Sequence, residues 1–205
     1  MNGTVRLWDG TTDTPIATIE GHSGDILALS FSPNSSQLAS LGLMDGTVIL
    51  WDETTGLPIA TLKGHSGDIK AFSFSPNSSQ LASLGSMEVT VRLWDGTTSL
   101  PIATHRDHSC AIELLTFSPN GSQLASLGWR DETVRLWDST GLPIATLEGH
   151  STYVNALSLS LNGSQLASSA KFDKIVRLWD GGTGVHITTG HLQYDDALLV
   201  SPNDS

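Results

Sequence analysis

Serine, histidine and acidic residues recur together four times in this sequence at constant spacing. Each histidine stands 18 residues before a serine, 23 before an acid and 29 before a tryptophan. The four sets are His22, Ser40, Asp45 and Trp51; His65, Ser83, Glu88 and Trp94; His108, Ser126, Asp131 and Trp137; and His150, Ser168, Asp173 and Trp179. Because Ser, His and Asp form the nucleophilic triad of many hydrolases, catalysis is the first chemistry to weigh.

The repetition favours a structural role for these sets. A hydrolase needs one activated serine with an oxyanion hole and a cleft, whereas this chain has four equivalent sets and no nucleophile-elbow sequence. If the acid orients the histidine and the serine joins the histidine to the indole N–H, each set satisfies its own polar groups. Burying such groups unpaired would cost about 1–3 kcal/mol each. We therefore predict four structural tetrads, no catalytic residue and no enzymatic activity.

The elements that position these residues follow from a repeat marked by the dipeptide Trp-Asp. It occurs at 8–9, 51–52, 94–95, 137–138 and 179–180, at intervals of 43, 43, 43 and 42 residues. A fixed period of this size indicates one structural unit copied along the chain. We therefore expect one repeat domain over 1–205, with units that end at each Trp-Asp and a partial unit over 181–205.

Each unit is predicted to hold four short strands. In the second copy, apolar or alternating runs cover 58–62, 69–74, 80–84 and 90–94, and Gly, Pro, Asn or Ser residues bound them. Runs of five or six residues between turn residues are typical of strands and too short for ordinary helices. Short strands joined by short turns form antiparallel meanders, and radial stacking of such sheets buries both faces of each. The fold class is therefore all-β.

The Gly-His and Trp-Asp pairs, with the Ser-Pro-Asn turn and the Leu-Ala-Ser strand between them, resemble the WD-repeat β-propeller family. The resemblance implies four-stranded blades and the tetrads described above. It also implies closure by strands from both termini, usually in a ring of seven blades. Here the two ends supply strands at 4–8, 15–19 and 197–200, which leaves one strand of the closing blade unfilled. We expect an incomplete, open propeller of four complete blades plus partial terminal strands, which a longer protein or oligomerisation would complete.

The copies differ from one another mainly at one end of the predicted sheets. The turns after the first strand and after Trp-Asp are nearly constant, whereas two other loops vary between copies. These variable loops come just after each Gly-His-Ser run, or Asp-His-Ser in the third copy (24–25, 67–68, 110–111 and 152–153), and just before each tetrad acid (43–44, 86–87, 129–130 and 171–172). They contain residue types that are favoured in interaction hot spots. The candidate partner-binding residues are Met44, Met87, Trp129, Arg130, Tyr153 and Phe172. Unconstrained drift of the loops is the competing explanation.

Composition narrows the possible partners. The net charge of −11 argues against binding to a nucleic-acid backbone, which requires clustered positive charge. No apolar run is long enough to span a membrane. One cysteine, Cys110, excludes an intramolecular disulfide, and no zinc, calcium or phosphate-binding motif is present, so we predict no cofactor and no metal. The expected location is cytoplasmic.

Three functions are consistent with this pattern. The first is a non-catalytic scaffold that binds protein or peptide through the variable loops, with a small-molecule ligand disfavoured. The second is the ligand-sensing repeat region of a larger receptor, because the near-identical repeats are similar to those of fungal NACHT-type proteins. The third is a propeller enzyme, which is the weakest because the periodic polar residues already have structural roles.

Overall fold

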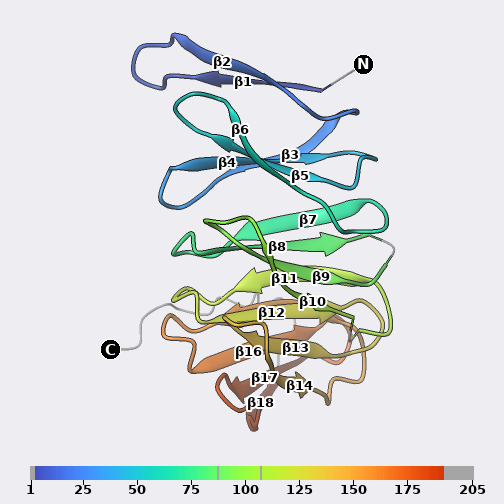
Figure 1. The fold of residues 1–205 in the computed structure, drawn as a ribbon. Coiled ribbons are helices and arrows are strands. Elements are labelled where there is room, and N and C mark those ends of the chain that lie inside the picture. Colours follow the sequence, from blue (N-terminus) through green and yellow to red (C-terminus); the bar gives the residue numbers. More distant parts are fainter. Residues whose placement is uncertain (1–2, 87, 107, 192–205) are drawn as a thin grey trace. The chain divides into compact units, whose positions relative to one another are not determined.

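The computed structural model describes residues 3–86, 88–106 and 108–191, which form 18 β-strands and no helix (Figure 1). The all-β prediction is confirmed. The chain divides into two compact units, residues 1–101 and 102–205. Within the described ranges, no helix is long and apolar enough to cross a membrane.

The strands form one two-stranded sheet and four four-stranded antiparallel sheets. The two-stranded sheet pairs β1 (Thr4–Trp8) with β2 (Pro15–Glu20). The first full sheet contains β3 (Ile26–Phe31), β4 (Gln37–Gly42), β5 (Val48–Asp52) and β6 (Pro58–Leu62). The second contains β7 (Ile69–Phe74), β8 (Gln80–Gly85), β9 (Val91–Asp95) and β10 (Pro101–His105). We call these full sheets copies 1 and 2.

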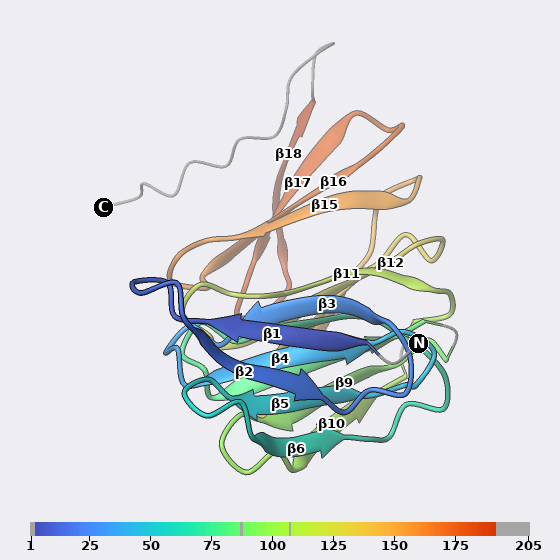
Figure 2. The same cartoon turned by 90° about the horizontal axis from the view of Figure 1, so that it is seen from above.

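Copies 3 and 4 repeat this arrangement. Copy 3 contains β11 (Ile112–Phe117), β12 (Gln123–Gly128), β13 (Val134–Asp138) and β14 (Pro143–Leu147). Copy 4 contains β15 (Val154–Leu159), β16 (Gln165–Ala170), β17 (Ile175–Asp180) and β18 (His186–His191). In each full sheet the strands lie side by side in chain order, as copy 4 shows clearly from above (Figure 2). The strand predicted at 197–200 lies outside the described residues.

The core lies between sheets of the same unit. In the N-terminal unit, Leu41 and Leu50 of copy 1 pack in one cluster with Phe74 and Trp94 of copy 2. In the C-terminal unit, Leu136 of copy 3 packs in an equivalent cluster with Trp179 of copy 4. Copies 1 and 3 therefore each bury one face by packing their second and third strands against the following copy of the same unit. This is the stacking that the repeat predicts.

The outer strand of the last copy departs from the sequence pattern by two residues. Gly190 and His191 resemble the earlier Gly-His pairs, but both lie inside β18. Gly190 pairs with Val176, as Leu147 pairs with Val134 one copy earlier. Gly190-His191 is therefore not equivalent to the other Gly-His pairs. The strand pairing places this dipeptide two residues earlier, at the positions of Leu147 and Glu148.

Candidate functional site

The first tetrad is a continuous chain of hydrogen bonds. Nδ1 of His22 lies 2.7 Å from Oδ2 of Asp45, and Nε2 lies 2.7 Å from Oγ of Ser40. The indole N–H of Trp51 donates to the same Oγ at 2.7 Å. Because the carboxylate can only accept, His22 donates from Nδ1 and accepts the Ser40 hydroxyl proton at Nε2. Each donor in this chain therefore has one acceptor.

The other copies repeat most of these contacts. The histidine Nε2 to serine Oγ distances are 2.7, 2.6 and 2.9 Å for Ser83, Ser126 and Ser168. The histidine Nδ1 lies 2.6 Å from Asp131 and 2.8 Å from Asp173, and Glu88 makes the equivalent contact with His65. Glu88 also accepts hydrogen bonds from the backbone N–H and hydroxyl of Ser66, so the longer acid folds back over this loop.

Copy 3 lacks one of these bonds. Trp94 and Trp179 donate to their serines at 2.9 and 2.8 Å. In the described chain, Trp137 makes no such bond to Ser126, contrary to the four-residue network expected there. Its ring instead stacks on the imidazole of His105, with 4.5 Å between the centroids. His105 stands where copies 1 and 3 have Leu62 and Leu147 at the end of the outer strand, so the stacking partner is specific to this position.

The tetrad acids also shape the loop that leads into the third strand. Asp45 accepts hydrogen bonds from the backbone N–H and hydroxyl of Thr47 at 3.0 and 2.8 Å. Burial acts to raise the pKa of Asp45, but the bonds from Thr47 and His22 outweigh it and lower the pKa. Asp131 has a lowered pKa on the same balance of burial against bonds from His108 and Thr133. Both acids are therefore held as carboxylates at neutral pH.

The order of the hydrogen bonds is that of a hydrolase triad, but the serines are inaccessible. The side chains of Ser40, Ser83, Ser126 and Ser168 are all 0 % exposed. In copies 1, 2 and 4 the serine Oγ also accepts an indole N–H, so one lone pair is already occupied. An acyl-transfer serine must reach a substrate carbonyl beside an oxyanion hole. The arrangement is suited to holding the second and third strands to the loops that carry the histidine and the acid.

The aspartate of each Trp-Asp pair organises a turn at the opposite end of the sheet. Asp52 accepts hydrogen bonds from the backbone N–H groups and hydroxyls of Thr54 and Thr55, which lower its pKa to about 2. In copies 2 and 4 this turn joins the turn after the first strand through a backbone bond, in which Gly96 donates to Ser79 and Gly181 to Ser164, each at 2.7 Å. The nearly constant turns are therefore neighbours, and their constancy has a structural reason.

The two variable loops of each copy are also neighbours. A backbone hydrogen bond joins them, from Leu43 to Asp25 in copy 1 and from Trp129 to Ala111 in copy 3, each at 2.7 Å. Met44 is 80 % exposed and has a left-handed backbone, with φ of 64°. Met87 lies outside the described residues. Each sheet thus presents its variable loops together at one end.

The candidate partner-binding residues of the C-terminal unit form two local pairs. The guanidinium of Arg130 lies 4.2 Å from the ring centroid of Trp129, which is 41 % exposed. Tyr153 meets Phe172 edge to face at 5.4 Å, and Lys171 lies 5.6 Å from the Phe172 ring. Phe172 is 61 % exposed, whereas Tyr153 is half-buried. Each pair combines an exposed aromatic ring with a cation.

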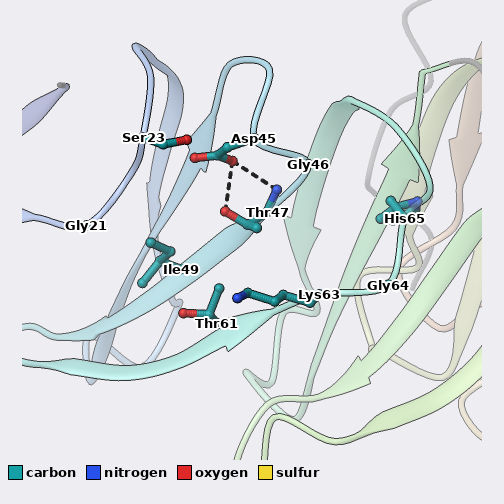
Figure 3. Close-up of a pocket in the computed structure, with 10 residues that line it drawn as sticks. All are labelled: Gly21, Ser23, Asp45, Gly46, Thr47, Ile49, Thr61, Lys63, Gly64 and His65. Atoms are coloured by element: carbon teal, nitrogen blue, oxygen red, sulfur yellow. Dashed lines mark hydrogen bonds between the residues drawn. The ribbon is translucent and has the colours of Figure 1, made fainter. Parts of the chain in front are cut away.

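Sequence reasoning missed a cavity in the N-terminal unit. A space of about 500 Å³ opens beside Ile49 and is lined by Gly21, Ser23, Asp45, Gly46, Thr47, Ile49, Thr61, Lys63, Gly64 and His65 (Figure 3). The sequence contains a signal for this cavity. The residue two positions before the tryptophan of each Trp-Asp pair is arginine in the other units and isoleucine only at position 49.

Metal or thiol chemistry finds no support among the described residues. No group of three or more His, Cys, Asp or Glu side chains in that part of the chain could hold a metal ion. Cys110 is a free thiol of intermediate exposure. The candidate functional features of the described residues are the variable loops and the cavity beside Ile49.

Comparison with known families identifies the repeat. The model of the family described as "WD domain, G-beta repeat" matches four times, over residues 13–52, 56–95, 99–138 and 141–180. Each match ends at the aspartate of a Trp-Asp pair and together they cover most of the chain. No curated protein matches the sequence. Domains built from these repeats are generally scaffolds for protein interactions.

Proposed function

Because this chain belongs to the WD-repeat family, we propose that it is a non-catalytic scaffold that binds protein or peptide through its variable loops. The observation that carries the proposal is the exposure of large side chains at these loops. Met44, Trp129 and Phe172 are 80, 41 and 61 % exposed. Drift without function would more often leave small polar residues at such positions.

Local geometry supports the same role. Arg130 over Trp129 and Lys171 near Phe172 hold the two aromatic rings in place before any partner arrives. Prior ordering reduces the entropy lost on binding. Edge-to-face packing with Tyr153 adds a second support for Phe172. These rings are suited to act as anchors for apolar or cationic side chains of a partner.

The test compares two double variants of the C-terminal unit. Trp129→Ala with Phe172→Ala removes both exposed rings of the variable loops. Leu142→Ala with Leu161→Ala is the matched control, because these leucines are 64 and 66 % exposed on the constant turns. Partners cross-linked to the wild-type chain in cells should be lost with the first variant and retained with the second. Equal recovery with both folded variants would rule out the proposed surface.

A second candidate role is the ligand-sensing repeat region of a larger NACHT-type receptor. It is favoured by the identity of residues 32–42 and 75–85, which repeat the same eleven letters. Transcript sequencing tests this role, because a nucleotide-binding P-loop encoded upstream supports it and a transcript without one removes it. We propose a cytoplasmic location for the protein in either role.

A further inference from the structure

We propose that the cavity beside Ile49 binds an arginine side chain of the partner. The inference rests on the proposed function, since Ser23 and the Asp45-Gly46 turn bring the variable loops of copy 1 to the cavity rim. It adds the chemical class of the partner, a peptide or protein segment that presents a guanidinium group.

The other copies supply their own arginine at this position. Arg92, Arg135 and Arg177 pair with the tetrad serines of the second strand, as Ile49 pairs with Ser40. The Nε atom of each of these arginines is buried. A site for a guanidinium group is therefore an integral part of the repeat. Among the four full sheets, only copy 1 lacks the arginine side chain that fills this site.

The contacts of these arginines define what the site offers. Nη1 of Arg135 donates to the hydroxyl of Thr146 at 3.0 Å. In copy 4, Arg177 donates to Thr189 at 3.4 Å and to the carbonyl oxygen of Gly149 at 2.7 Å. The site thus provides a threonine hydroxyl on the outer strand and the glycine carbonyl of the Gly-His pair, which together accept two N–H groups of one planar fork.

Copy 1 keeps the surroundings without the arginine. Thr61 pairs with Ile49 as Thr146 pairs with Arg135, and Gly21 stands at the position of Gly149. Both line the cavity. Within the described chain the Thr61 hydroxyl makes no hydrogen bond. A Cβ on Gly21 would lie 2.7 Å from Cη2 of Trp51 and 3.3 Å from Cδ1 of Ile49, so both side chains border Gly21. Ile49 carries no N–H group, and the Trp51 indole N–H donates to Ser40, so neither side chain supplies the donors of the missing guanidinium.

Charge favours a cationic side chain. The Asp45 carboxylate lines the cavity, and the chain as a whole carries a net charge of −11. Lys63 reaches across the cavity toward Thr61 (Figure 3), but it is an exposed, flexible side chain that can turn into solvent. Copy 2 has Arg106 at the position of Lys63 as well as Arg92 in the site, so the repeat accommodates both cations.

Arginine is favoured over lysine by geometry. The two acceptors lie on different elements, and a guanidinium presents five N–H donors in a fixed plane that can meet both at once. A lysine ammonium is a compact charge that holds its water more strongly. The opposite possibility, an anion bound to Lys63, is one outcome of the experiment below.

The experiment titrates the isotopically labelled full chain with three probes and follows backbone amide signals by NMR. The probes are the capped tripeptides Gly-Arg-Gly and Gly-Lys-Gly and inorganic phosphate. The arginine peptide should give saturable shifts at Gly21, Ser23, Gly46 and Gly64, with affinity at least about tenfold above that of the lysine peptide. Preference for lysine or for phosphate, or no saturable shift at these amides, would overturn the proposal.

Two substitutions test the site itself. Ile49→Arg restores the side chain found in the other copies and should abolish binding of the arginine peptide, while an unchanged amide spectrum elsewhere reports an intact fold. Arg135→Ile opens the equivalent site in copy 3 and should create a second binding site beside Thr146 and Glu148. Binding that survives Ile49→Arg would refute the assignment.

The same titration separates this inference from the proposed function. The Trp129→Ala and Phe172→Ala variant should bind the arginine peptide as the wild type does, because the cavity belongs to the N-terminal unit. Loss of cellular partners in that variant with retained peptide binding supports both proposals. If the variant keeps both its cellular partners and its binding of the arginine peptide, only the proposed aromatic surface is rejected.

Discussion

Val89 and Gly46 occupy the same position in copies 2 and 1, directly after the tetrad acid, and both have a left-handed backbone. Their φ angles are 53° and 63°. Glycine adopts this region freely, but a β-branched side chain there crowds the backbone at a cost of about 1–2 kcal/mol. The loop geometry is therefore set by the tetrad acid and the strand that follows, and Val89 is held in it by the surrounding structure.

Replacement of Val89 by glycine should stabilise the protein. Relief of the backbone strain exceeds the extra conformational entropy that glycine adds to the unfolded chain, so we expect a gain of about 1 kcal/mol in the free energy of unfolding. Urea denaturation measures it. The reverse change, Gly46→Val, should lower stability by at least that amount, because a Cβ there would also lie 3.0 Å from the carbonyl oxygen of Gly67. If both variants shift the midpoint in the same direction, the strain assignment is wrong.

The serine of the tetrad should matter more in copy 1 than in copy 3. Ser40→Ala leaves His22 Nε2 and the Trp51 N–H without their partner, whereas Ser126→Ala deprives His108 alone. Each buried group left unpaired costs about 1–3 kcal/mol, so Ser40→Ala should lose more free energy of unfolding by about that amount. Both serines are 0 % exposed, which matches the two sites for burial. Equal losses would show that the indole bond contributes nothing.

Acid should destabilise the protein in part through Glu88. Burial acts to raise the pKa of Glu88, but bonds from Ser66, Thr90 and His65 prevail and lower the pKa from 4.5 to about 2. The unfolded chain thus binds this proton more tightly, so the stabilisation is complete above about pH 4.5 and is lost as the pH falls toward 2. Urea midpoints of wild type and Glu88→Gln should differ at pH 7 and converge near pH 2. A constant difference across this range would contradict the prediction.

His65 should extend the acid sensitivity to higher pH. Burial lowers the pKa of His65 below its usual 6.5, against the opposing effect of Glu88. Because the unfolded chain takes up this proton first, the neutral imidazole stabilises the fold above about pH 6.5 and that stabilisation declines below it. NMR titration of the His65 ring signals tests the direction. A midpoint above 6.5 would reverse the sign.

A buried glutamine should couple neighbouring copies of the C-terminal unit. Nε2 of Gln123 donates to the carbonyl oxygen of Gly181 at 2.7 Å, and Gln123 is 8 % exposed. Gln123→Glu replaces this donor with an acceptor and buries a charge, so it should cost at least about 2 kcal/mol at pH 7. Gln165 stands at the same position in copy 4 and is exposed, which makes Gln165→Glu the matched control. Thermal unfolding of both variants measures the loss of stability. Equal losses for Gln123→Glu and Gln165→Glu would show that this coupling is absent.

Much of the fold was predictable because the repeat gives every position several independent observations. The strand over 69–74 was expected with the bounds that β7 has, and β6 likewise matches 58–62. The strand over 90–94 begins one residue later as β9, since the hydrogen-bonded ladder with β8 starts at Val91. Constant spacing also grouped the tetrad residues, whose side chains the antiparallel register brings within hydrogen-bonding distance.

Other features depended on differences between copies and were harder to anticipate. His105 on Trp137 and Arg130 on Trp129 are contacts between side chains whose rotamers follow from local packing. The shift of Gly190 into β18 follows from strand pairing, which a dipeptide resemblance does not reveal. The left-handed backbone of Val89 was hidden because its residue type disfavours it.

By itself, the sequence determined that this chain is a WD-repeat protein of short antiparallel strands with one buried polar set in each full sheet. It could do so because strand length, turn residues and repeat spacing are local properties that recur in every copy. Only the tertiary structure decided which exposed rings are paired and where space remains. The cavity beside Ile49 illustrates the physical reason. Replacing arginine by a shorter side chain leaves a binding space only where the outer strand and the Gly-His loop enclose that position.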